Sequence, residues 1–490
     1  MLERLAAALL MALPRPGQDV SPADWLKAQA RPRFREGHTL PPLTRFGWTL
    51  PFDTRVELAE HWGYALEFGG YATHKAVDRA LNDPSSDEAR AVALAASNPK
   101  KYPLAVILSR DLPENPPPET WTRNARGEFL GKNKVWSPEA PRSVLEQAAE
   151  LRAGPLRRLR AKVPVAMILN GGEYALGVLG FAQKEWEQDP RIQAARGGKD
   201  WYSYISEKKA LMETVIAEAV RKAVPDRTLY IYYTAGGGTH RHRTADWQKW
   251  AYGFEWMRTA SDLPSNEYYY RHFNDGWTGN NDMLTLALNA RGFELSFQAK
   301  HSYDWLCAGW IDESKKPQSL PDNPAALVDP GAGKLGDLGL YTGFLKCLYT
   351  AGMLGGNAGY YAFPQGGFGK KFPADRPPHW IRQMVALSRV HAFFSHHEAF
   401  LRESDLLPGP DRHRWSKGQP AYEFPAGTGA RVLARRHARR PTWLVTAWAA
   451  DGNARDVSVE IPELGAVRLR ARPEGAVYLG DRAGLKLLEE

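Results

Sequence analysis

The sequence predicts an α/β protein, a (β/α)8 barrel followed by a small antiparallel β-sandwich. From Pro41 onward, eight short apolar runs alternate with helical patterns, and such alternation requires parallel strands joined by crossovers. The length of 490 residues accommodates a barrel of about 250–400 residues and one further module. After residue 405, short strands separated by turns replace this pattern, which is typical of a β-sandwich.

The eight expected strands are runs rich in aliphatic and aromatic residues. They lie at residues 45–50, 64–68, 104–108, 163–169, 228–233, 267–273, 302–308 and 358–363. Between them, apolar residues at three- and four-residue spacing predict helices, for example at 205–223, 283–298 and 380–394. The number of units, rather than any single segment, favours a closed barrel.

Two connections are long and polar or rich in Pro and Gly. Residues 112–141 follow the third strand and residues 311–338 follow the seventh, so both belong to the carboxyl face where barrel enzymes bind substrates. Loops of this length usually have a function. We expect them to form walls of a substrate cleft; the alternative is an insertion without a role.

Three domains are expected: an N-terminal segment at 1–40, the barrel at 41–405 and the β-sandwich at 406–490. The start of the chain resembles a signal peptide, which favours a secreted or periplasmic protein; the alternative is a peripheral first helix in a cytoplasmic protein. No other segment approaches the roughly 20 apolar residues that span a bilayer. The sandwich is expected to cap the barrel rather than bind carbohydrate, and its strands are expected at 431–435, 442–448, 457–461, 467–471 and 476–479.

The composition fits a globular protein that contacts sugars. Seventeen Trp, 20 Tyr and 18 Phe supply aromatic faces that stack on sugar rings, although a large aromatic core is the simpler explanation for many of them. The formal net charge of +9 makes an anionic glycan one alternative for the substrate. No zinc-ligand spacing or basic ribbon accompanies this charge, which argues against nucleic acid. Cys307 and Cys347 are expected to be buried free thiols.

The segment Asn170-Gly171-Gly172-Glu173 is the main indication of chemistry. It closes the fourth expected strand, so the carboxylate of Glu173 follows a strand at its carboxyl end, where barrel enzymes carry catalytic groups. Cleavage of a glycosidic bond needs one carboxyl group to protonate the leaving oxygen and a second to attack or to activate water. Glu173 is the expected acid/base; the alternative is a helix cap or an ion pair with an arginine.

With these features the chain resembles the clan A retaining glycoside hydrolases, the broad group of (β/α)8 enzymes that includes β-galactosidases, agarases and mannanases. The resemblance covers the order of elements from about Pro41 to Phe400 and the appended β-domain. It implies an acid/base glutamate directly after an asparagine at the end of strand four, and a nucleophile at the end of strand seven. This sequence differs, because two glycines separate Asn170 from Glu173.

The second carboxylate has three candidates. Glu313 is the expected nucleophile, and Asp312 beside it is a reserve, since both follow strand seven. Glu267 is another reserve, and it reaches the catalytic face only if strand six is really residues 260–265. Asp304 lies in the middle of strand seven and would point to the barrel core or to the helices.

Hydroxyl recognition and ring stacking predict further binding residues. The expected substrate-binding residues are Asn170, Tyr174, Trp48, Trp277, Asn280 and Trp310.

The sequence therefore predicts a glycoside hydrolase that acts on a polysaccharide or oligosaccharide by a retaining two-carboxylate mechanism, without a cofactor or metal. One alternative is a non-catalytic carbohydrate-binding barrel. Another is a metal-dependent hydrolase or polysaccharide lyase, for which His240, His242 and His272 would be the place to look.

Overall fold

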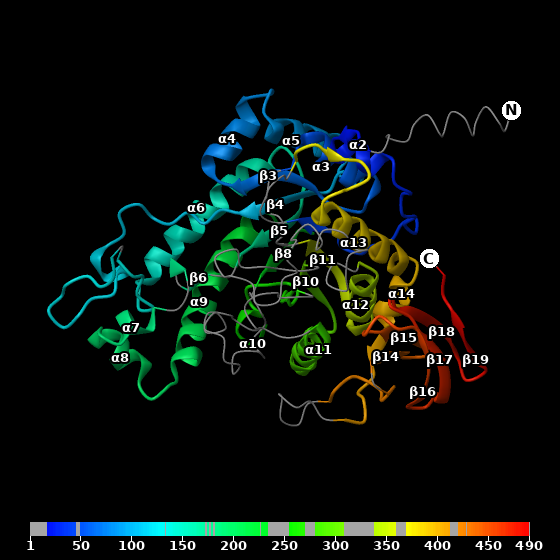
Figure 1. The fold of residues 1–490 in the computed structure, drawn as a ribbon. Coiled ribbons are helices and arrows are strands. Elements are labelled where there is room, and N and C mark those ends of the chain that lie inside the picture. Colours follow the sequence, from blue (N-terminus) through cyan, green and yellow to red (C-terminus); the bar gives the residue numbers. More distant parts are fainter. Residues whose placement is uncertain are drawn as a thin grey trace. The chain divides into compact units, whose positions relative to one another are not determined.

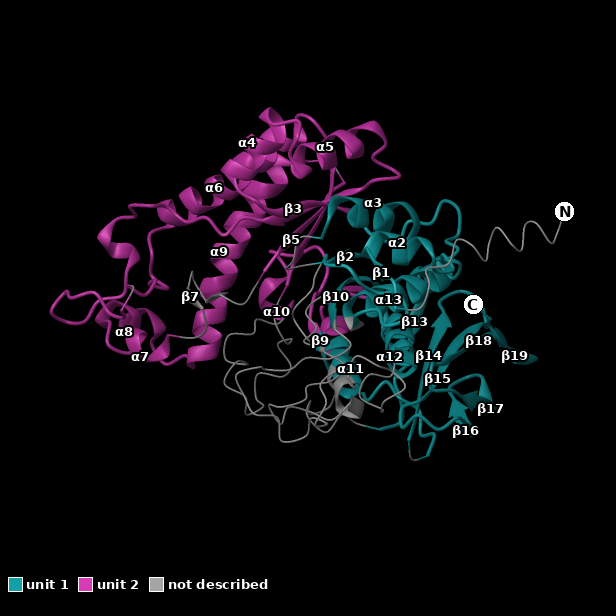
Figure 2. Ribbon diagram, turned by 45° about the horizontal axis from the view of Figure 1, so that its top comes forward, with its two compact units in different colours: residues 1–65, 268–292, 305–490 teal, residues 66–267, 293–304 magenta. Residues whose placement is uncertain are grey.

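The structure is a computed structural model. It describes residues 17–45, 50–132, 134–171, 174–175, 178–179, 182–225, 227–233, 254–269, 280–307, 338–358, 369–411, 420–427 and 429–489. The chain divides into two compact units (Figure 2). Unit 1 comprises residues 1–65, 268–292 and 305–490, and unit 2 comprises residues 66–267 and 293–304.

The fold is mixed α/β, with parallel sheets and an antiparallel C-terminal region (Figure 1). Unit 2 contains a four-stranded sheet whose neighbouring strands are all parallel. In spatial order they are β3 (Leu66–Ala72), β4 (Leu104–Leu108), β5 (Val165–Asn170) and β8 (Leu229–Tyr232). The four strands expected here are confirmed. The largely buried apolar runs of β4, β5 and β8 are typical of a parallel sheet covered on both faces, whereas β3 contains Glu67 and two glycines.

Unit 2 also contains helices. They are α4 (His74–Asn82), α5 (Asp87–Ser97), α6 (Arg142–Arg160), α7 (Gln183–Trp186), α8 (Pro190–Arg196), α9 (Trp201–Ala223) and α10 (Phe254–Met257). Of these helices, α4, α5 and α6 contact the four-stranded sheet. The long helix α6 packs against α4 and α9, and α5 packs against β3. Thr73, Ser86 and Asp200 accept backbone N–H groups at the starts of α4, α5 and α9, which fixes where these helices begin.

A second four-stranded sheet has the order β2-β11-β10-β9. Its strands are β2 (Thr44–Arg45), β11 (Met353–Ala358), β10 (Ser302–Cys307) and β9 (Glu267–Tyr269). The last barrel strand was expected at 358–363, of which residues 359–363 lie outside the described residues; the strand β11 is described at 353–358 and was not predicted there. Every residue of β11 is buried, so close packing tolerates its two glycines where strand propensity disfavours them.

Three long helices accompany these strands: α11 (Asn280–Ser296), α12 (Leu338–Ala351) and α13 (His379–Ser395). The helical patterns that the sequence shows at 283–298 and 380–394 are thus confirmed. On α12, Cys347 is a buried free thiol, as expected, and burial raises the pKa of this thiol. Only the backbone of Cys307 is described.

The N-terminal residues belong to unit 1 and pair with distant segments of it. They include β1 (Asp19–Val20), which pairs antiparallel with β12 (Phe372–Pro373), and the helices α2 (Pro22–Lys27) and α3 (Phe52–His61). The buried carboxylate of Glu398, on α14 (Glu398–Glu403), accepts the backbone N–H of Thr39 at 2.8 Å and pairs with Arg35 at 3.0 Å and Arg402 at 2.8 Å. The signal-like start of the chain lies outside the described residues.

Two antiparallel sheets form the C-terminal region. One contains β13 (Ser404–Leu406), β14 (Ala430–His437), β15 (Trp443–Ala449), β18 (Ala476–Asp481) and β19 (Gly484–Leu487), and the other pairs β16 (Arg455–Ile461) with β17 (Gly465–Ala471). Apolar side chains of both sheets share one core, for example Val432 and Val445 with Val459. The five strands expected here are confirmed, whereas β13 and β19 were not predicted.

A buried arginine connects this region to the helices of unit 1. Arg435 on β14 is 1% exposed, and its guanidinium donates four hydrogen bonds, to Ser404 Oγ, Ser404 O, Thr350 O and Leu401 O. Burial lowers the pKa of Arg435 to about 10, so the group stays charged at neutral pH. The planar guanidinium of Arg435 directs several N–H donors to these oxygens at once, whereas the single ammonium group of a lysine could not reach all of them.

We expect Arg435→Met to destabilise the protein by about 3 kcal/mol, because it leaves buried carbonyl groups without donors. Urea unfolding monitored by tryptophan fluorescence measures the change. Arg435→Lys should recover little of it. The control is Arg439→Ala, since the side chain of Arg439 is 79% exposed. Equal unfolding midpoints for Arg435→Met and Arg439→Ala would contradict the structural role.

The Glu398 cluster predicts a pH dependence of stability. Burial raises the pKa of Glu398, but hydrogen bonds from Thr39 and Arg402 outweigh it and lower the pKa from 4.5 to about 2. A depressed carboxyl pKa stabilises the folded state above the unfolded value, and this contribution is lost as the pH falls from about 4.5 toward 2. Glu398→Gln should therefore lower the melting temperature at pH 7 and matter progressively less below pH 4.5.

Thermal unfolding of wild type and Glu398→Gln between pH 2.5 and 7 tests this dependence, with Glu474→Gln at an exposed position as the control. A melting-temperature difference that stays constant across the range would count against it.

Candidate functional site

The carboxyl end of β5 is the centre of the candidate site. This strand lies between β4 and β8 and ends at Asn170, and the backbone N–H of Tyr233 continues the pairing by donating to the Asn170 carbonyl at 2.8 Å. The expected acid/base, Glu173, is three residues further on and lies outside the described residues. A short antiparallel pair follows, β6 (Tyr174–Ala175) with β7 (Val178–Leu179), and only the backbone of Tyr174 is described.

Asn170 is fixed from inside the protein. Its side chain is 3% exposed, and its Nδ2 atom donates to Glu213 Oε2 at 2.8 Å and to the Tyr230 hydroxyl at 2.9 Å. Both amide hydrogens are thus used, so the observed role of Asn170 is to position the end of β5. Its expected contact with a sugar stays a prediction and would have to use the Oδ1 atom.

A buried ion pair lies behind Asn170 on α9. Lys209 Nζ and Glu213 Oε1 are 2.7 Å apart, and each side chain is 2% exposed. Burial lowers the pKa of Lys209, and the negative charge of Glu213 opposes this shift. This pair was not predicted from the sequence. Its only signal is a Lys and a Glu four residues apart, with the apolar residues Met212 and Ile216 on the same helix.

The start of β9 matters for Glu267, a reserve nucleophile, because Glu267 reaches the catalytic face only if strand six begins before it. Backbone pairing begins before Glu267, because Asp262 N donates to Tyr230 O and Tyr303 N donates to Pro264 O, both at 2.9 Å. Asn266 Nδ2 bonds Glu294 on α11 at 2.5 Å. Glu267 is the first residue of β9, and its role as a reserve nucleophile stays a prediction.

Asp304 on β10 has a structural environment. Its Oδ1 atom accepts the backbone N–H of Asn266 at 3.2 Å, and its Oδ2 atom accepts the Ser302 hydroxyl at 2.6 Å. With a side chain 3% exposed, Asp304 joins two neighbouring segments of the chain.

The remaining expected site residues belong to parts of the chain that are not described. Glu313, Asp312, Trp48, Trp277 and Trp310 lie outside the described residues, and only the backbone of Asn280, the first residue of α11, is described. The histidines at 240, 242 and 272 lie outside them too. Among the side chains that are described, no group of three or more His, Cys, Asp or Glu could hold a metal ion. No helix within the same residues is long and apolar enough to cross a membrane.

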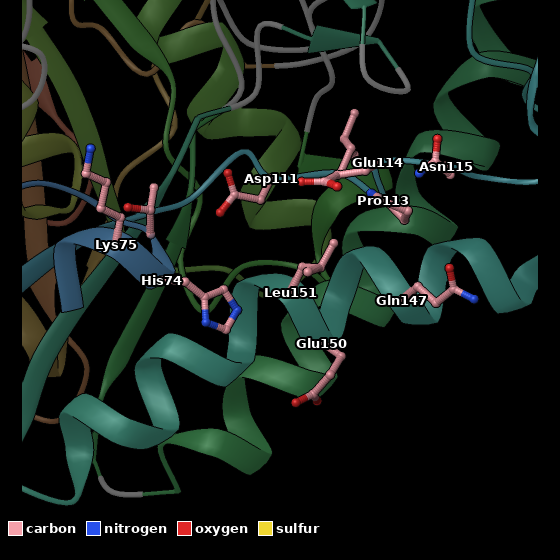
Figure 3. Close-up of a pocket in the computed structure, with 11 residues that line it drawn as sticks. His74, Lys75, Asp111, Pro113, Glu114, Asn115, Gln147, Glu150 and Leu151 are labelled. Carbon is pink, nitrogen blue, oxygen red and sulfur yellow. The ribbon is translucent and has the colours of Figure 1, made fainter. Parts of the chain in front are cut away.

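A cavity of about 940 Å³ lies where β3 and β4 end (Figure 3). Thr73 directly follows β3, and Asp111 follows β4 by three residues. Five of the eleven lining residues carry an amide or a carboxyl group, and such groups can bind the hydroxyls of a ligand. The lining residues are Thr73, His74, Lys75, Asp111, Leu112, Pro113, Glu114, Asn115, Gln147, Glu150 and Leu151. Glu150 bonds Arg157, and this hydrogen bond lowers the pKa of Glu150.

The long connection after β4 is folded and anchored. Residues 121–136, here named the basic hairpin, are bridged at Trp121–Trp136 and at Arg123–Phe129. The buried carboxylate of Asp189, at the start of α8, accepts the backbone N–H of Arg123 at 2.9 Å. Trp186 Nε1 donates to the Trp136 carbonyl at 3.0 Å. The segments that follow β4 and β5 are therefore joined to each other.

The buried pair on α9 predicts a large loss of stability when one partner is removed. Glu213→Gln should cost about 3–5 kcal/mol, because it leaves the Lys209 charge buried without compensation. Urea unfolding measures this, and adding Lys209→Met should recover part of the loss. The matched control is Glu146→Gln, which removes an exposed i, i+4 pair with Arg142 and should cost less than about 0.5 kcal/mol. Equal losses for Glu213→Gln and Glu146→Gln would contradict the importance of the buried pair.

The sequence matches no protein-family model and no curated protein. One similar solved structure is a GH36 α-galactosidase of Geobacillus stearothermophilus in complex with 1-deoxygalactonojirimycin, with 11% identity, a TM-score of 0.45, and coverage of 95% of this chain and 58% of that chain. A GH27 β-L-arabinopyranosidase of the same organism shows 10% identity and a TM-score of 0.37, over 94% and 98% of the two chains. A maltogenic α-amylase of Thermotoga neapolitana shows 11% identity and a TM-score of 0.35, over 79% and 76%. The chain thus spans 58% of the length of the first of these proteins.

Proposed function

We propose that this chain is a glycoside hydrolase that cleaves glycosidic bonds in a polysaccharide or oligosaccharide by a retaining mechanism. The observation that carries the proposal is the position of Glu173 in the chain. It follows Asn170, the last residue of a central parallel strand, by three residues. In barrel enzymes, catalytic groups come from the carboxyl ends of strands.

The architecture proposed with it is a closed (β/α)8 barrel. At one edge, Leu43 N donates to Gly63 O at 2.9 Å and Ala65 N donates to Leu43 O at 2.7 Å, which connects the chain before β2 to the chain before β3. At the other edge, the bond from Asp262 N to Tyr230 O connects β8 to the chain before β9. The parallel pairing of β2 with β11 supports closure too, because a closed barrel leaves no strand edge unpaired.

In the proposed mechanism, Glu173 protonates the oxygen of the leaving group while a second carboxylate attacks the anomeric carbon. The glycosidic bond breaks, and a covalent glycosyl-enzyme forms. Glu173 then removes a proton from water, which displaces the enzyme carboxylate with retention of configuration. We assign the nucleophile to Glu313, with Asp312 and Glu267 as reserves.

We also propose that residues 41–405 form the catalytic domain and that residues 406–490 cap it. The shared apolar core of the C-terminal strands supports a separate folding unit. Phe344 on α12 and Trp448 on β15, with ring centroids 6.2 Å apart, support a packing role for this region. Trp48, Tyr174, Trp277, Asn280 and Trp310 are proposed to contact the sugar.

Glu173→Gln should reduce kcat about 10²–10⁴-fold, because the amide keeps the shape but cannot transfer the proton. Release of reducing ends from a panel of neutral and anionic polysaccharides and oligosaccharides measures this. The control is Glu187→Gln, an exposed glutamate on the same connection, and both variants should unfold at the wild-type temperature. Undiminished turnover by Glu173→Gln would exclude it as the acid/base.

A further inference from the structure

The basic hairpin concentrates positive charge at an exposed position. Its 16 residues contain Arg123, Arg126, Lys132 and Lys134 but only one acid, Glu128. Arg126, Lys132 and Lys134 are exposed, and within the described part of the chain none of the four cations forms an ion pair. Glu128 bonds Asn124 Nδ2 at 2.7 Å instead. The three exposed cations are therefore available to an external anion.

Aromatic rings hold two of these cations in place. Lys134 Nζ lies 4.4 Å from the ring centroid of Phe129 and 5.8 Å from that of Trp121, and Arg123 Cζ lies 4.8 Å from that of Phe129. The Phe129 ring is itself 42% exposed. Such cation–π contacts restrict flexible side chains before any ligand binds, so less conformational entropy is lost on binding.

The backbone at Lys134 is strained. Its φ of +55° is in the left-handed region, which residues other than glycine adopt at a cost. Strain of this kind is often retained where it orients a functional side chain. Here it accompanies the placement of the lysine ammonium group over two rings.

The base of the hairpin is rigid. Arg191 Nη2 donates to the Trp121 carbonyl at 2.8 Å and pairs with Asp189 at 2.7 Å. Burial raises the pKa of Asp189, but the bonds from Arg191 and Arg123 outweigh it and keep that pKa below its usual value. The carboxylate is thus charged at neutral pH and holds the hairpin against α8, as Figure 1 shows.

We propose that the basic hairpin binds an anionic polysaccharide, a chain of sugars that carry carboxylate or sulfate groups. This proposal rests on the glycoside hydrolase function and names its substrate class. The hairpin is part of the connection between β4 and α6. Because β4 and β5 are parallel neighbours, this connection starts at the same edge of the sheet as the segment that contains Glu173. The helices that anchor it, α7 and α8, come directly after Glu173 and β6–β7 in the chain.

Charge complementarity selects this ligand class. The cations of the hairpin and the net charge of +9 attract a polyanion, and exposed pairs of this kind weaken as salt screens them. The place of the hairpin in the connection that follows β4 favours a glycan over a nucleic acid, which becomes an outcome of the test.

Binding is measured by isothermal titration calorimetry with the Glu173→Gln protein, which separates binding from turnover. The ligands are polygalacturonate, a sulfated galactan, neutral dextran and single-stranded DNA, at 50 and 500 mM salt. In that background, Lys132→Ala with Lys134→Ala removes two hairpin charges. Lys100→Ala with Lys222→Ala removes two exposed charges elsewhere and is the matched control.

We expect at least one anionic glycan to bind in a salt-dependent manner, more tightly than dextran and DNA. The hairpin variant should raise its Kd at least about tenfold, a loss of roughly 1.4 kcal/mol, and the control should leave it unchanged. If the first variant is destabilised, Arg126→Ala with Lys132→Ala replaces it, because neither residue forms one of the cation–π contacts described above. This second variant should also raise the Kd for the anionic glycan.

Equal losses in hairpin and control variants, tighter binding of DNA, or no preference over dextran would each overturn the proposal. Wild-type hydrolysis of neutral glycans alone would overturn the anionic substrate class and leave the hydrolase function intact. If the wild-type protein binds an anionic glycan but hydrolyses no glycan, the hydrolase function is overturned and binding of an anionic glycan by the hairpin remains.

Discussion

The buried ion pair between Lys209 and Glu213 is the interaction on which the candidate site depends most. Two charges that are 2% exposed can remain in the interior only if they compensate each other and their remaining polar atoms are bonded. Asn170 supplies one such bond to Glu213 and thereby ties the last residue of β5 to α9. This polar contact consequently fixes Asn170 at the carboxyl end of β5.

A second buried charge organises the surroundings of the site in the same way. Asp189 and Arg191 hold the basic hairpin to the segment that follows β5, so the connections after β4 and β5 form one supported surface rather than two independent loops. A site on rigid, mutually braced elements keeps its groups in a fixed geometry. The cavity at the ends of β3 and β4 adjoins the same connection.

Much of the fold was predictable because local signals and burial agree. The predicted bounds of the strand at 104–108 are those observed for β4. A continuous apolar run of this length is typical of a buried strand in a parallel sheet. At β11 the local signal and the burial disagree: Gly355 and Gly356 disfavour a strand by propensity, yet every residue of this strand is buried, so residues 353–357 were not predicted as a strand. The sequence also predicts correctly that the strand before Glu173 ends at about Asn170. The partners of Asn170 were not predictable, because an i, i+4 Lys–Glu pair usually indicates a solvent-exposed helix face, and its burial depends on packing between distant segments.

The central claim is that Glu173 and a second carboxylate form a catalytic pair at the carboxyl end of the parallel strands. The most direct measurement is their separation in a crystal structure of the Glu173→Gln protein with an oligosaccharide bound across the site. We predict that the amide introduced at position 173 and the carboxyl group of Glu313, Asp312 or Glu267 lie on opposite sides of the scissile bond, about 5–5.5 Å apart. A structure with no carboxylate within about 10 Å of position 173 would contradict it, because neither the retaining nor the inverting mechanism operates with one carboxyl group.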